Sequence, residues 1–368
     1  MKLLMISGDR SVASGKESAF FQTLSRLSTQ FDRIDVLCPR VRGRAVEQVF
    51  SNVFLHPART GRLFYPLWIR VAGRTLFEAH GHSVLTVHDY PPFLNGIGAR
   101  LLLRKIRIPS VCEIHHLVGV PHAASLIEWC ARMMNRLYLR RHVRHFTALR
   151  VVNSSVKQAL VRMGIPDDRI TIVPSVYLDL PLLDGIPETE KRYDFVFSAR
   201  IVPNKDLKTV LSALAEVPNA TMLIIGDGPA LPAMKRHAEK LGLDARVTFA
   251  GWLATAHDVM SAMKSGSVFI MHSKSEGNPR VAIEAMALGL PVIATRVGIM
   301  PDVIEDGRNG LIVSGKRDDL TRALKEITSA EERIRRMGSA AVEDVRRFSS
   351  DLTLIGYASF LRSFHVSA

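Results

Sequence analysis

Short β-rich apolar runs alternate with helical stretches along the whole chain, and this alternation restricts the folds that the chain can adopt. The runs are almost continuously hydrophobic, which is typical of parallel strands that are buried on both faces. In the first half we expect strands at 2–7, 33–38, 83–87, 110–114, 149–152 and 170–173. In the second half we expect them at 194–198, 221–225, 247–249, 267–271, 291–294 and 311–313. This pattern predicts an α/β protein with two doubly wound parallel sheets.

The length of 368 residues is too great for one ordinary α/β unit, so we expect two domains. Glycine, proline and charged residues interrupt the periodic pattern at 182–192 and predict a linker there. We therefore expect Rossmann-like domains at 1–185 and 186–350, facing each other across a cleft. The last segment, 351–368, is apolar and helical, and we expect it to cross back to the first domain.

The net charge of +14 is unevenly distributed between the two halves. Residues 1–185 contain 25 Lys and Arg against 13 Asp and Glu, whereas the remaining residues contain 24 against 22. A basic half indicates a surface that meets anions, such as phospholipid head groups, a pyrophosphate-bearing substrate or nucleic acid. The chain has no aromatic-rich basic motif of the kind that reads single-stranded RNA, so we expect no nucleic-acid partner.

Cysteine usage and the start of the chain bear on its location. Cys38, Cys112 and Cys130 form no C-x-x-C pair, which predicts neither a disulfide framework nor a zinc site. The apolar start is too short for a signal peptide, and no run of 18 or more apolar residues occurs. We expect a cytoplasmic protein.

The glycine-containing segment 14–17 does not form a P-loop. Arg10 and Glu17 occupy the positions where that motif needs a glycine and a hydroxyl residue, which excludes a P-loop NTPase. Two interpretations of Gly15 stay open. Its loop amides could face an anion of the donor, or it could be a turn glycine without a ligand.

Two glutamates, Glu276 and Glu284, stand in the apolar stretch 275–295. Asn278 is a predicted N-cap for a helix over 279–288 that has proline at its first position. The free N–H groups at this helix N-terminus would suit a diphosphate. A carboxylate inside an apolar helix needs a partner, and we interpret the hydroxyl groups of a bound sugar nucleotide as the partner of Glu284.

Basic residues follow the first strand of the second domain. Arg200 leaves the carboxyl end of that strand, and Lys205 opens the next helix. Both side chains are expected to point into the cleft and to neutralise a pyrophosphate.

Several of these features occur together in one known family. They are the spacing Glu276-x7-Glu284, Arg200 followed by Lys205, the Gly-Asp-Gly-Pro turn at 226–229, Phe249-Ala250-Gly251, and the segment 288–295. In order and spacing they resemble the retaining glycosyltransferases of family 4 (glycosyl transferases group 1), which have the GT-B fold. The resemblance implies an enzyme that moves a hexose from a nucleotide diphosphate sugar to a hydroxyl of a lipid-linked or polysaccharide acceptor.

The same resemblance implies roles for individual residues. Glu276 would contact the donor hexose near the anomeric centre, Glu284 would bind the ribose hydroxyls, and Arg200 and Lys205 would neutralise the diphosphate. Gly277 and Asn278 would also belong to the donor site, although Gly277-Asn278-Pro279 replaces the family's Gly-Phe-Gly. Retention would follow a same-face route without a protein nucleophile. Because the chain has no Asp-x-Asp, we expect no essential metal and no cofactor.

His115 follows the strand 110–114, where the family often has a histidine that faces the acceptor and the donor sugar. We therefore assign it a catalytic role, and the alternative is a histidine that only bonds to a loop. His88 and Asp89 end the preceding strand in a similar way. Metal binding by His115 and His116 is not expected, because adjacent strand-end side chains diverge.

Two basic stretches could explain the charge of the first half. Arg132, Arg136, Arg140 and Arg144 recur at every fourth residue and predict a cationic stripe on a helix, and segment 59–77 mixes arginines with apolar residues. We interpret them as a membrane or acceptor patch that places the protein peripherally on the inner face of an anionic membrane. The alternative is a solvated charged face over ordinary core packing.

Two further functions stay open. A nucleotide-sugar epimerase of the GT-B fold would form product without an acceptor. A basic protein without catalysis could bind membrane or nucleic acid, but it would not need the four residues Arg200, Lys205, Glu276 and Glu284.

Overall fold

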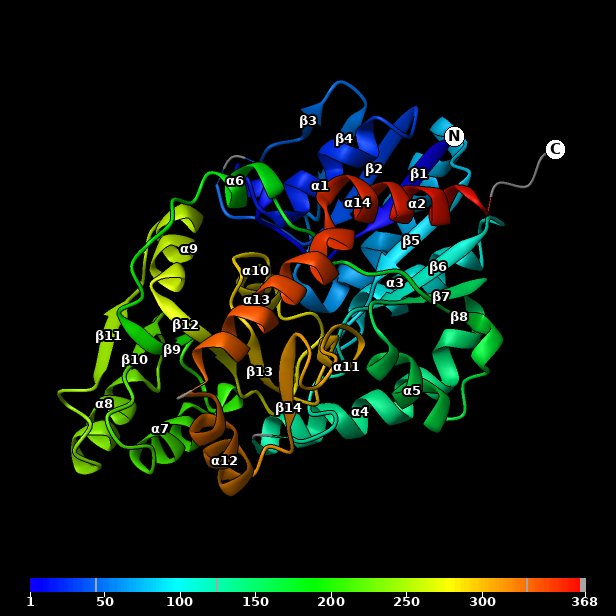
Figure 1. Ribbon diagram of the computed structural model, residues 1–368. Coiled ribbons are helices and arrows are strands. Elements are labelled where there is room, and N and C mark those ends of the chain that lie inside the picture. The colour runs from blue at the N-terminus through cyan, green and yellow to red at the C-terminus, as the bar shows by residue number, and fades with distance from the viewer. Residues whose placement is uncertain (44, 124, 329, 365–368) are drawn as a thin grey trace. The chain divides into compact units, whose positions relative to one another are not determined.

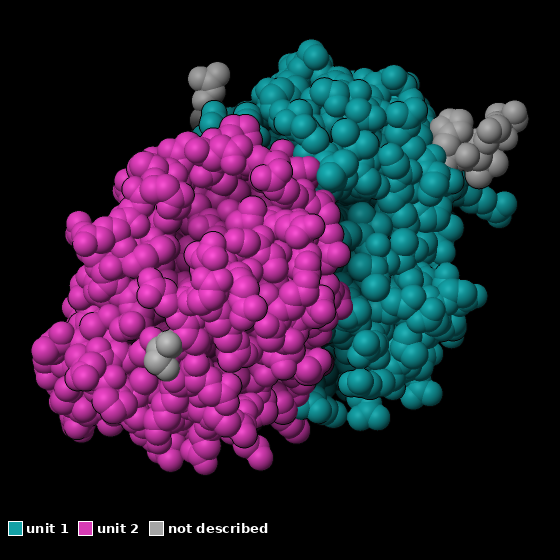
Figure 2. All heavy atoms as spheres, in the orientation of Figure 1, with its two compact units in different colours: residues 1–117, 130–175, 351–368 teal, residues 118–129, 176–350 magenta. Residues whose placement is uncertain are grey.

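A computed structural model describes residues 1–43, 45–123, 125–328 and 330–364. The chain divides into two compact units, which Figure 2 distinguishes by colour. Unit 1 contains Met1–Leu117, Cys130–Ser175 and the described residues from Asp351 onward, and unit 2 contains Val118–Trp129 and Val176–Ser350.

Unit 1 is built on an eight-stranded sheet with the strand order β3-β4-β2-β1-β5-β6-β7-β8 (Figure 1). The strands are β1 (Lys2–Ile6), β2 (Arg33–Cys38), β3 (Gln48–Phe50), β4 (Val53–Pro57), β5 (Val84–His88), β6 (Ser110–Ile114), β7 (Ala148–Val151) and β8 (Ile170–Ile172). All neighbouring strands pair in parallel except β3, which runs antiparallel to β4 at the edge of the sheet.

The helices of unit 1 are α1 (Ala19–Ser28), α2 (Tyr65–His80), α3 (Leu94–Leu103), α5 (Ser154–Arg162) and α14 (Ser350–Arg362), whose first residue belongs to unit 2. Four 3-10 turns accompany them: η1 (Val12–Ser14), η2 (Arg62–Phe64), η3 (Val143–His145) and η4 (Asp167–Arg169). Helix α4 (Leu126–His142) contains residues of both units, because the division falls at Cys130.

Unit 2 contains a six-stranded parallel sheet with the order β11-β10-β9-β12-β13-β14. The strands are β9 (Tyr193–Ser198), β10 (Met222–Ile225), β11 (Val247–Gly251), β12 (Gly266–Met271), β13 (Val292–Thr295) and β14 (Gly310–Val313). Numbered within the unit, this order is 3-2-1-4-5-6, the Rossmann order, in which the strand sequence reverses between β9 and β12.

The helices of unit 2 are α6 (Leu180–Asp184), α7 (Leu207–Ala215), α8 (Leu231–Lys240), α9 (Ala256–Lys264), α10 (Arg280–Ala287), α11 (Met300–Val303), α12 (Arg317–Thr328) and α13 (Glu331–Val345). Two 3-10 turns, η5 (Pro203–Lys205) and η6 (Arg346–Phe348), complete the unit. Among the described residues of the chain, no helix combines the length and apolar character needed to cross a membrane.

Burial explains why the strands have continuous apolar sequences. Leu3 and Leu4 are both fully buried although consecutive strand residues point to opposite faces, so both faces of β1 are covered. Each predicted strand is present, with its ends shifted by one or two residues at most. The edge strand β3 and its neighbour β4 are not predicted from the sequence.

The C-terminal helix α14 packs against the sheet of unit 1. Tyr357, Ala358 and Leu361 are buried in the same hydrophobic cluster as Leu3 of β1 and Ile34 of β2. Helix α14 is therefore part of the core of the first unit.

The predicted boundary between residues 185 and 186 is wrong. Unit 2 begins at Val176, and its first helix, α6, occupies part of the predicted linker. Leu183 and Ile186 are buried in the hydrophobic core of unit 2, which explains why this segment is not a free connection. Residues 118–129 also belong to unit 2.

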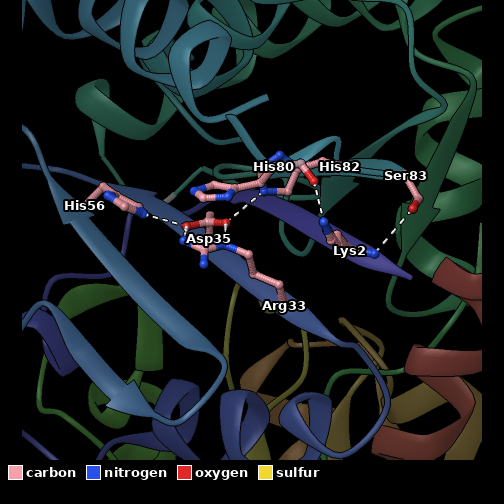
Figure 3. Close-up of polar contacts among 7 residues, drawn as sticks. All are labelled: Lys2, Arg33, Asp35, His56, His80, His82 and Ser83. Atoms are coloured by element: carbon pink, nitrogen blue, oxygen red, sulfur yellow. Dashed lines mark hydrogen bonds and ion pairs between the residues drawn. The ribbon is translucent and has the colours of Figure 1, made fainter. Parts of the chain in front are cut away.

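A buried carboxylate joins three parts of unit 1 (Figure 3). Asp35 of β2 is fully buried and accepts hydrogen bonds from Arg33 and from the Nε2 atoms of His56 and His82, both at 2.8 Å. Burial alone would raise the pKa of Asp35, but the hydrogen bonds from both histidines and Arg33 hold it well below its usual value. These contacts fix β2 against β4 and against the segment that precedes β5.

Candidate active site

Unit 2 has a pocket of about 570 Å³ where its strand order reverses. Residues that follow β9 and β12 line it, together with the first turn of α10. Helices on the two sides of a reversal leave the sheet in opposite directions, which opens a crevice at the carboxyl ends of the strands. Of the predicted donor residues, this pocket brings together Arg200, Lys205, Glu276, Asn278 and Glu284.

Lys205 and Glu276 form an ion pair within this pocket. Lys205 ends the turn η5, and Glu276 lies in the loop between β12 and α10. Asn204 connects the two segments, because its Nδ2 donates to the Ser275 carbonyl at 2.9 Å and its Oδ1 accepts from the Ser275 amide at 3.1 Å. The position of the pair is therefore fixed by contacts on both sides.

Arg200 is exposed and lies just beyond the carboxyl end of β9. Within the described part of the chain its guanidinium has no ion-pair partner. Gly226, which also lines the pocket, has φ +126°, and a Cβ there would lie 2.0 Å from the Ala199 carbonyl oxygen. Only glycine allows this turn to pass so close to the segment that carries Arg200.

Glu284 has a protein partner that the sequence analysis did not expect. Arg280 Nε lies 2.7 Å from Glu284 Oε1, one helical turn away, and the Glu284 side chain is only 13% exposed. The interpretation that Glu284 depends on a ligand for a partner is therefore wrong. Arg280 also stacks on the Tyr177 ring, 5.0 Å from its centroid, and its side chain is 40% exposed.

Helix α10 begins one residue later than predicted. Its N-cap is Pro279 rather than Asn278, because Pro279 has ψ 90° and lies outside the helical region. Asn278 still lines the pocket. Gly277 supports the loop through its carbonyl, which accepts from the Ile299 amide at 3.0 Å.

Sequence reasoning missed two residues that line this pocket. His272 is 2% exposed and follows β12, and its Nδ1 lies 3.3 Å from Asp206 Oδ2. Trp252 follows β11 and is 75% exposed. The rule that strand ends carry site residues predicts both positions when it is applied to β11 and β12 as well as β9.

His115, in unit 1, lies at the end of β6 beside a buried ionic cluster. Its Nε2 lies 3.1 Å from Glu113 Oε2, and Glu113 is also paired with Arg150. Tyr357 of α14 donates to Glu113 Oε1 at 2.5 Å. Burial alone would raise the pKa of Glu113, but Arg150 and His115 outweigh it and keep the carboxyl ionised well below its usual range.

The His115 ring is half-buried and stacks on His88, with ring centroids 4.2 Å apart. Burial lowers the pKa of His115 in spite of the Glu113 hydrogen bond. Burial and the neighbouring His115 lower the pKa of His88 to about 3. Both imidazoles are therefore neutral near pH 7, and within the described part of the chain no three His, Cys, Asp or Glu side chains form a metal-binding group.

Gly15, the predicted anion-facing glycine, also belongs to unit 1. It ends the turn η1 with φ +78°, and its amide donates to the Val12 carbonyl at 2.9 Å. This amide is used within the turn, so the structure supports the interpretation of Gly15 as a turn glycine.

The predicted arginine stripe lies on the surface of the chain. Arg132, Arg136 and Arg140 are exposed on α4, whereas Arg144 is exposed in the turn η3 after the helix has ended. Leu137 is 72% exposed and Met133 is 38% exposed on the same helix, while Asn135 and Leu139 are buried. The helix thus presents a mixed cationic and apolar outer face.

Family models of known proteins match residues in both units. Residues 184–344 match the family model of glycosyl transferases group 1, and residues 15–175 match that of a glycosyl transferase 4-like domain. A D-inositol 3-phosphate glycosyltransferase of Segniliparus rotundus is 31% identical over 309 residues, which cover 78% of this chain and 67% of that protein. The sulfoquinovosyl transferase of Arabidopsis thaliana is 26% identical over 301 residues, which cover 77% of this chain and 57% of the relative.

Solved structures share the architecture. The sucrose-phosphate synthase of Thermosynechococcus elongatus superposes with a TM-score of 0.79 at 19% identity, covering 98% of both chains. Anabaena HepE, solved in complex with UDP-glucose, gives 0.71 at 19% identity and covers 99% of this chain and 100% of its own. The chain therefore belongs to the group 1 glycosyltransferases and has their GT-B fold, which confirms the resemblance seen in the sequence.

Asp89 generates a testable pH dependence of stability. Burial raises its pKa to about 7, and its Oδ1 accepts from the Gly96 amide at 2.9 Å. The unfolded chain releases this proton near pH 4, so the buried carboxyl should destabilise the fold increasingly from about pH 4 up to its folded pKa. We expect Asp89→Asn to gain about 2–3 kcal/mol of unfolding free energy over the wild type between pH 5 and pH 8.

Urea unfolding at the two pH values measures this difference. Asp168→Asn, at an exposed carboxylate of unit 1, is the control and should show no such change. An unfolding free energy of Asp89→Asn that differs from the wild type by the same amount at both pH values would show that Asp89 is ionised normally.

Proposed function

We propose that this chain transfers a hexose from a nucleotide diphosphate sugar to a hydroxyl of a lipid-linked or polysaccharide acceptor, with retention at the anomeric carbon. The observation that carries the proposal is the convergence of Arg200, Lys205, Glu276 and Glu284 on one pocket where the strand order of unit 2 reverses. The family membership and the UDP-glucose complex of the Anabaena neighbour support a nucleotide sugar as the donor.

Different residues of the pocket can contact the diphosphate, the ribose and the base of such a donor. Arg200 and Lys205 supply two cations, and Arg280 and Val281 of the first turn of α10 line the same pocket. Cations and a helix N-terminus are both favourable to a diphosphate. Glu284 can accept from ribose hydroxyls if these take over the role of Arg280, and the exposed indole of Trp252 offers a face for the base.

The chemical step needs positioning and charge stabilisation more than a protein nucleophile. The bond between the anomeric carbon and the diphosphate oxygen breaks, and its electron pair leaves with the diphosphate. The acceptor oxygen bonds to the same face of that carbon, and its proton passes to the departing diphosphate. In this scheme Arg200 and Lys205 stabilise the leaving group, and Glu276, already held by Lys205, orients the hexose.

The same two cations take the place that a divalent metal has at other diphosphate sites, so the proposed transfer needs no metal and no cofactor. His115, which Glu113 orients through its Nε2, would present its Nδ1 to a substrate hydroxyl as a hydrogen-bond acceptor.

Removal of the paired cation tests the proposed transfer. We expect Lys205→Ala to lower kcat by about a hundredfold or more, because the leaving diphosphate loses a preorganised positive charge. Glu276→Ala should lower kcat to a similar extent, because Glu276 orients the hexose.

Steady-state kinetics with the best donor of a nucleotide-sugar panel measures both effects. Lys208→Ala is the matched control, because Lys208 is exposed on α7 and lies outside the pocket lining. Circular dichroism should show an intact fold in all variants. Wild-type turnover in either Lys205→Ala or Glu276→Ala would refute the proposed assignment.

We further propose that α4 holds the protein against an anionic membrane surface. Exposed arginines alternate on it with exposed apolar residues, and Leu137 is 72% exposed. A helix of this kind lies in the interface, where lipid head groups attract the arginines and the apolar side chains enter the acyl boundary. This arrangement would suit an enzyme with a lipid-linked acceptor.

Vesicle sedimentation tests the role of α4. We expect Arg136→Glu combined with Arg140→Glu to abolish sedimentation with vesicles of phosphatidylcholine and phosphatidylglycerol at low salt, because the charge of the helix is reversed. Arg104→Glu combined with Arg162→Glu changes the net charge equally at exposed sites of unit 1 and should bind normally. Equal binding by both double variants would assign the attraction to overall charge and overturn the proposed role of α4.

A further inference from the structure

Unit 1 has a pocket of its own, of about 450 Å³, that the proposed donor site does not use. It lies beyond the carboxyl ends of three strands, because Gly8 and Arg10 follow β1, Arg40 follows β2 and Tyr90 follows β5. The strand order of this sheet reverses between β1 and β5. The pocket is therefore at the position where an open α/β sheet binds a ligand.

The lining of this pocket is strongly cationic. Arg10, Arg40 and Arg62 line it, and none of these exposed guanidinium groups forms an ion pair with any residue that the structure describes. An adjoining hollow of about 700 Å³ shares Arg10 and Arg40 and adds Arg42 and Arg59. Among the described residues that line either cavity, Glu47 alone is acidic.

Two hydroxyl groups in the same place lack partners. Thr60 Oγ1 and Tyr65 Oη are buried, and neither atom has a hydrogen-bond partner among the described residues. The whole Tyr65 residue is only 4% exposed, so water does not easily reach its hydroxyl group. Both residues line the pocket. An unsatisfied buried hydroxyl costs free energy, about 1–3 kcal/mol, so these two groups indicate a polar ligand.

The arginine side chains repel one another, and the two hydroxyl groups have no acceptor. A bound anion with several oxygen atoms would satisfy both. Guanidinium groups bind phosphate oxygens in a bidentate geometry, and hydroxyl groups can donate to the remaining oxygens. A neutral polysaccharide would leave the charge of this pocket uncompensated. The chemistry of the lining therefore fits a phosphate ester.

Exposed apolar side chains are adjacent in sequence to two residues that line the pocket. The turn η2 and the start of α2 place Arg62 and Tyr65 in the pocket lining, whereas Leu63 and Phe64, between them in sequence, are 88% and 63% exposed. Leu67 and Val71 continue this exposed face along α2. An exposed apolar surface beside an anion site suits a ligand that carries both groups.

We infer that this pocket binds the phosphate of a lipid acceptor, whose apolar chain lies on the face formed by Leu63, Phe64, Leu67 and Val71. The inference rests on the proposed function, and it narrows the acceptor from a lipid-linked or polysaccharide hydroxyl to a phosphate-bearing amphiphile. The hydroxyl that receives the hexose belongs to the same molecule as the phosphate, so the arginines fix the acceptor by its charge.

Isothermal titration of the full chain with three small probes separates the contributions. Glycerol 3-phosphate carries the phosphate alone, monomeric lysophosphatidic acid adds one acyl chain, and monoacylglycerol carries the chain without phosphate. We expect lysophosphatidic acid to bind at least tenfold more tightly than glycerol 3-phosphate, and monoacylglycerol to bind more weakly than either.

Two double variants separate the contribution of the phosphate to the affinity from that of the acyl chain. Arg40→Gln combined with Arg62→Gln should weaken both phosphate probes at least tenfold. Leu63→Asn combined with Phe64→Asn should reduce the affinity for lysophosphatidic acid to that for glycerol 3-phosphate and leave the latter unchanged. Arg104→Gln combined with Arg162→Gln, at exposed sites outside the pocket, is the control for net charge and should bind as the wild type does.

Wild-type affinity of the Arg40 and Arg62 double variant for both probes would overturn the phosphate site. If the wild type binds glycerol 3-phosphate and lysophosphatidic acid with equal affinity, the acyl chain makes no contribution. That result would overturn the proposal of a lipid acceptor and indicate a phosphorylated soluble acceptor. Lys205→Ala should keep full affinity for lysophosphatidic acid, so a failed donor assignment would leave the acceptor result standing. A failed acceptor result would likewise leave the Lys205 kinetics unaffected.

Discussion

The reversal of strand order in a parallel sheet is the constraint from which both sites of this protein follow. Crossover helices on the two sides of a reversal leave the sheet in opposite directions, so the carboxyl ends of the two central strands face open space. In unit 2 the reversal lies between β9 and β12, and in unit 1 it lies between β1 and β5. The pocket of each unit lies at its reversal, and the residues that line it come largely from the loops that begin there.

The charges around the two pockets are organised differently. The two carboxylates that line the unit 2 pocket each have a cationic partner, because Glu276 is paired with Lys205 and Glu284 with Arg280. Such pairs give each partly buried side chain a countercharge before a ligand arrives, and a ligand can replace one partner without leaving a bare charge. The arginines that line the unit 1 pocket, Arg10, Arg40 and Arg62, form no ion pair with any described residue, so their countercharge has to come from the ligand.

Much of the fold could be predicted from the sequence, because continuous apolar runs report burial on both faces directly. The exceptions are at the edge of the sheet and between the units. β3 was missed because it has only three residues and is not fully buried, and β4 because only two of its five residues are fully buried, which weakens the apolar pattern. The domain boundary was misplaced because Leu183 and Ile186 stand among residues that usually form linkers, although both are core residues.

The pocket of unit 2 could be predicted only in part, because the sequence reports local chain geometry more directly than side-chain pairing. Arg200, Lys205 and Glu276 follow from strand ends and motif spacing, which depend on local chain geometry. Arg280 stands at i−4 from Glu284, a spacing that allows an ion pair on a helix, whereas the apolar residues around Glu284 indicate a carboxylate without a protein partner. The N-cap at Asn278 was wrong because capping depends on the ψ angle of Pro279, which the residue types alone do not determine.

The central claim is that the pocket at the reversal of unit 2 binds a nucleoside diphosphate through both cations and Glu284. Titration calorimetry with UDP, GDP and ADP, using the wild type, Glu284→Ala and the exposed helical control Glu239→Ala, tests it most directly. We predict that one nucleotide binds the wild type and the control equally and Glu284→Ala at least tenfold more weakly. Equal affinity of that nucleotide for all three proteins would contradict the account.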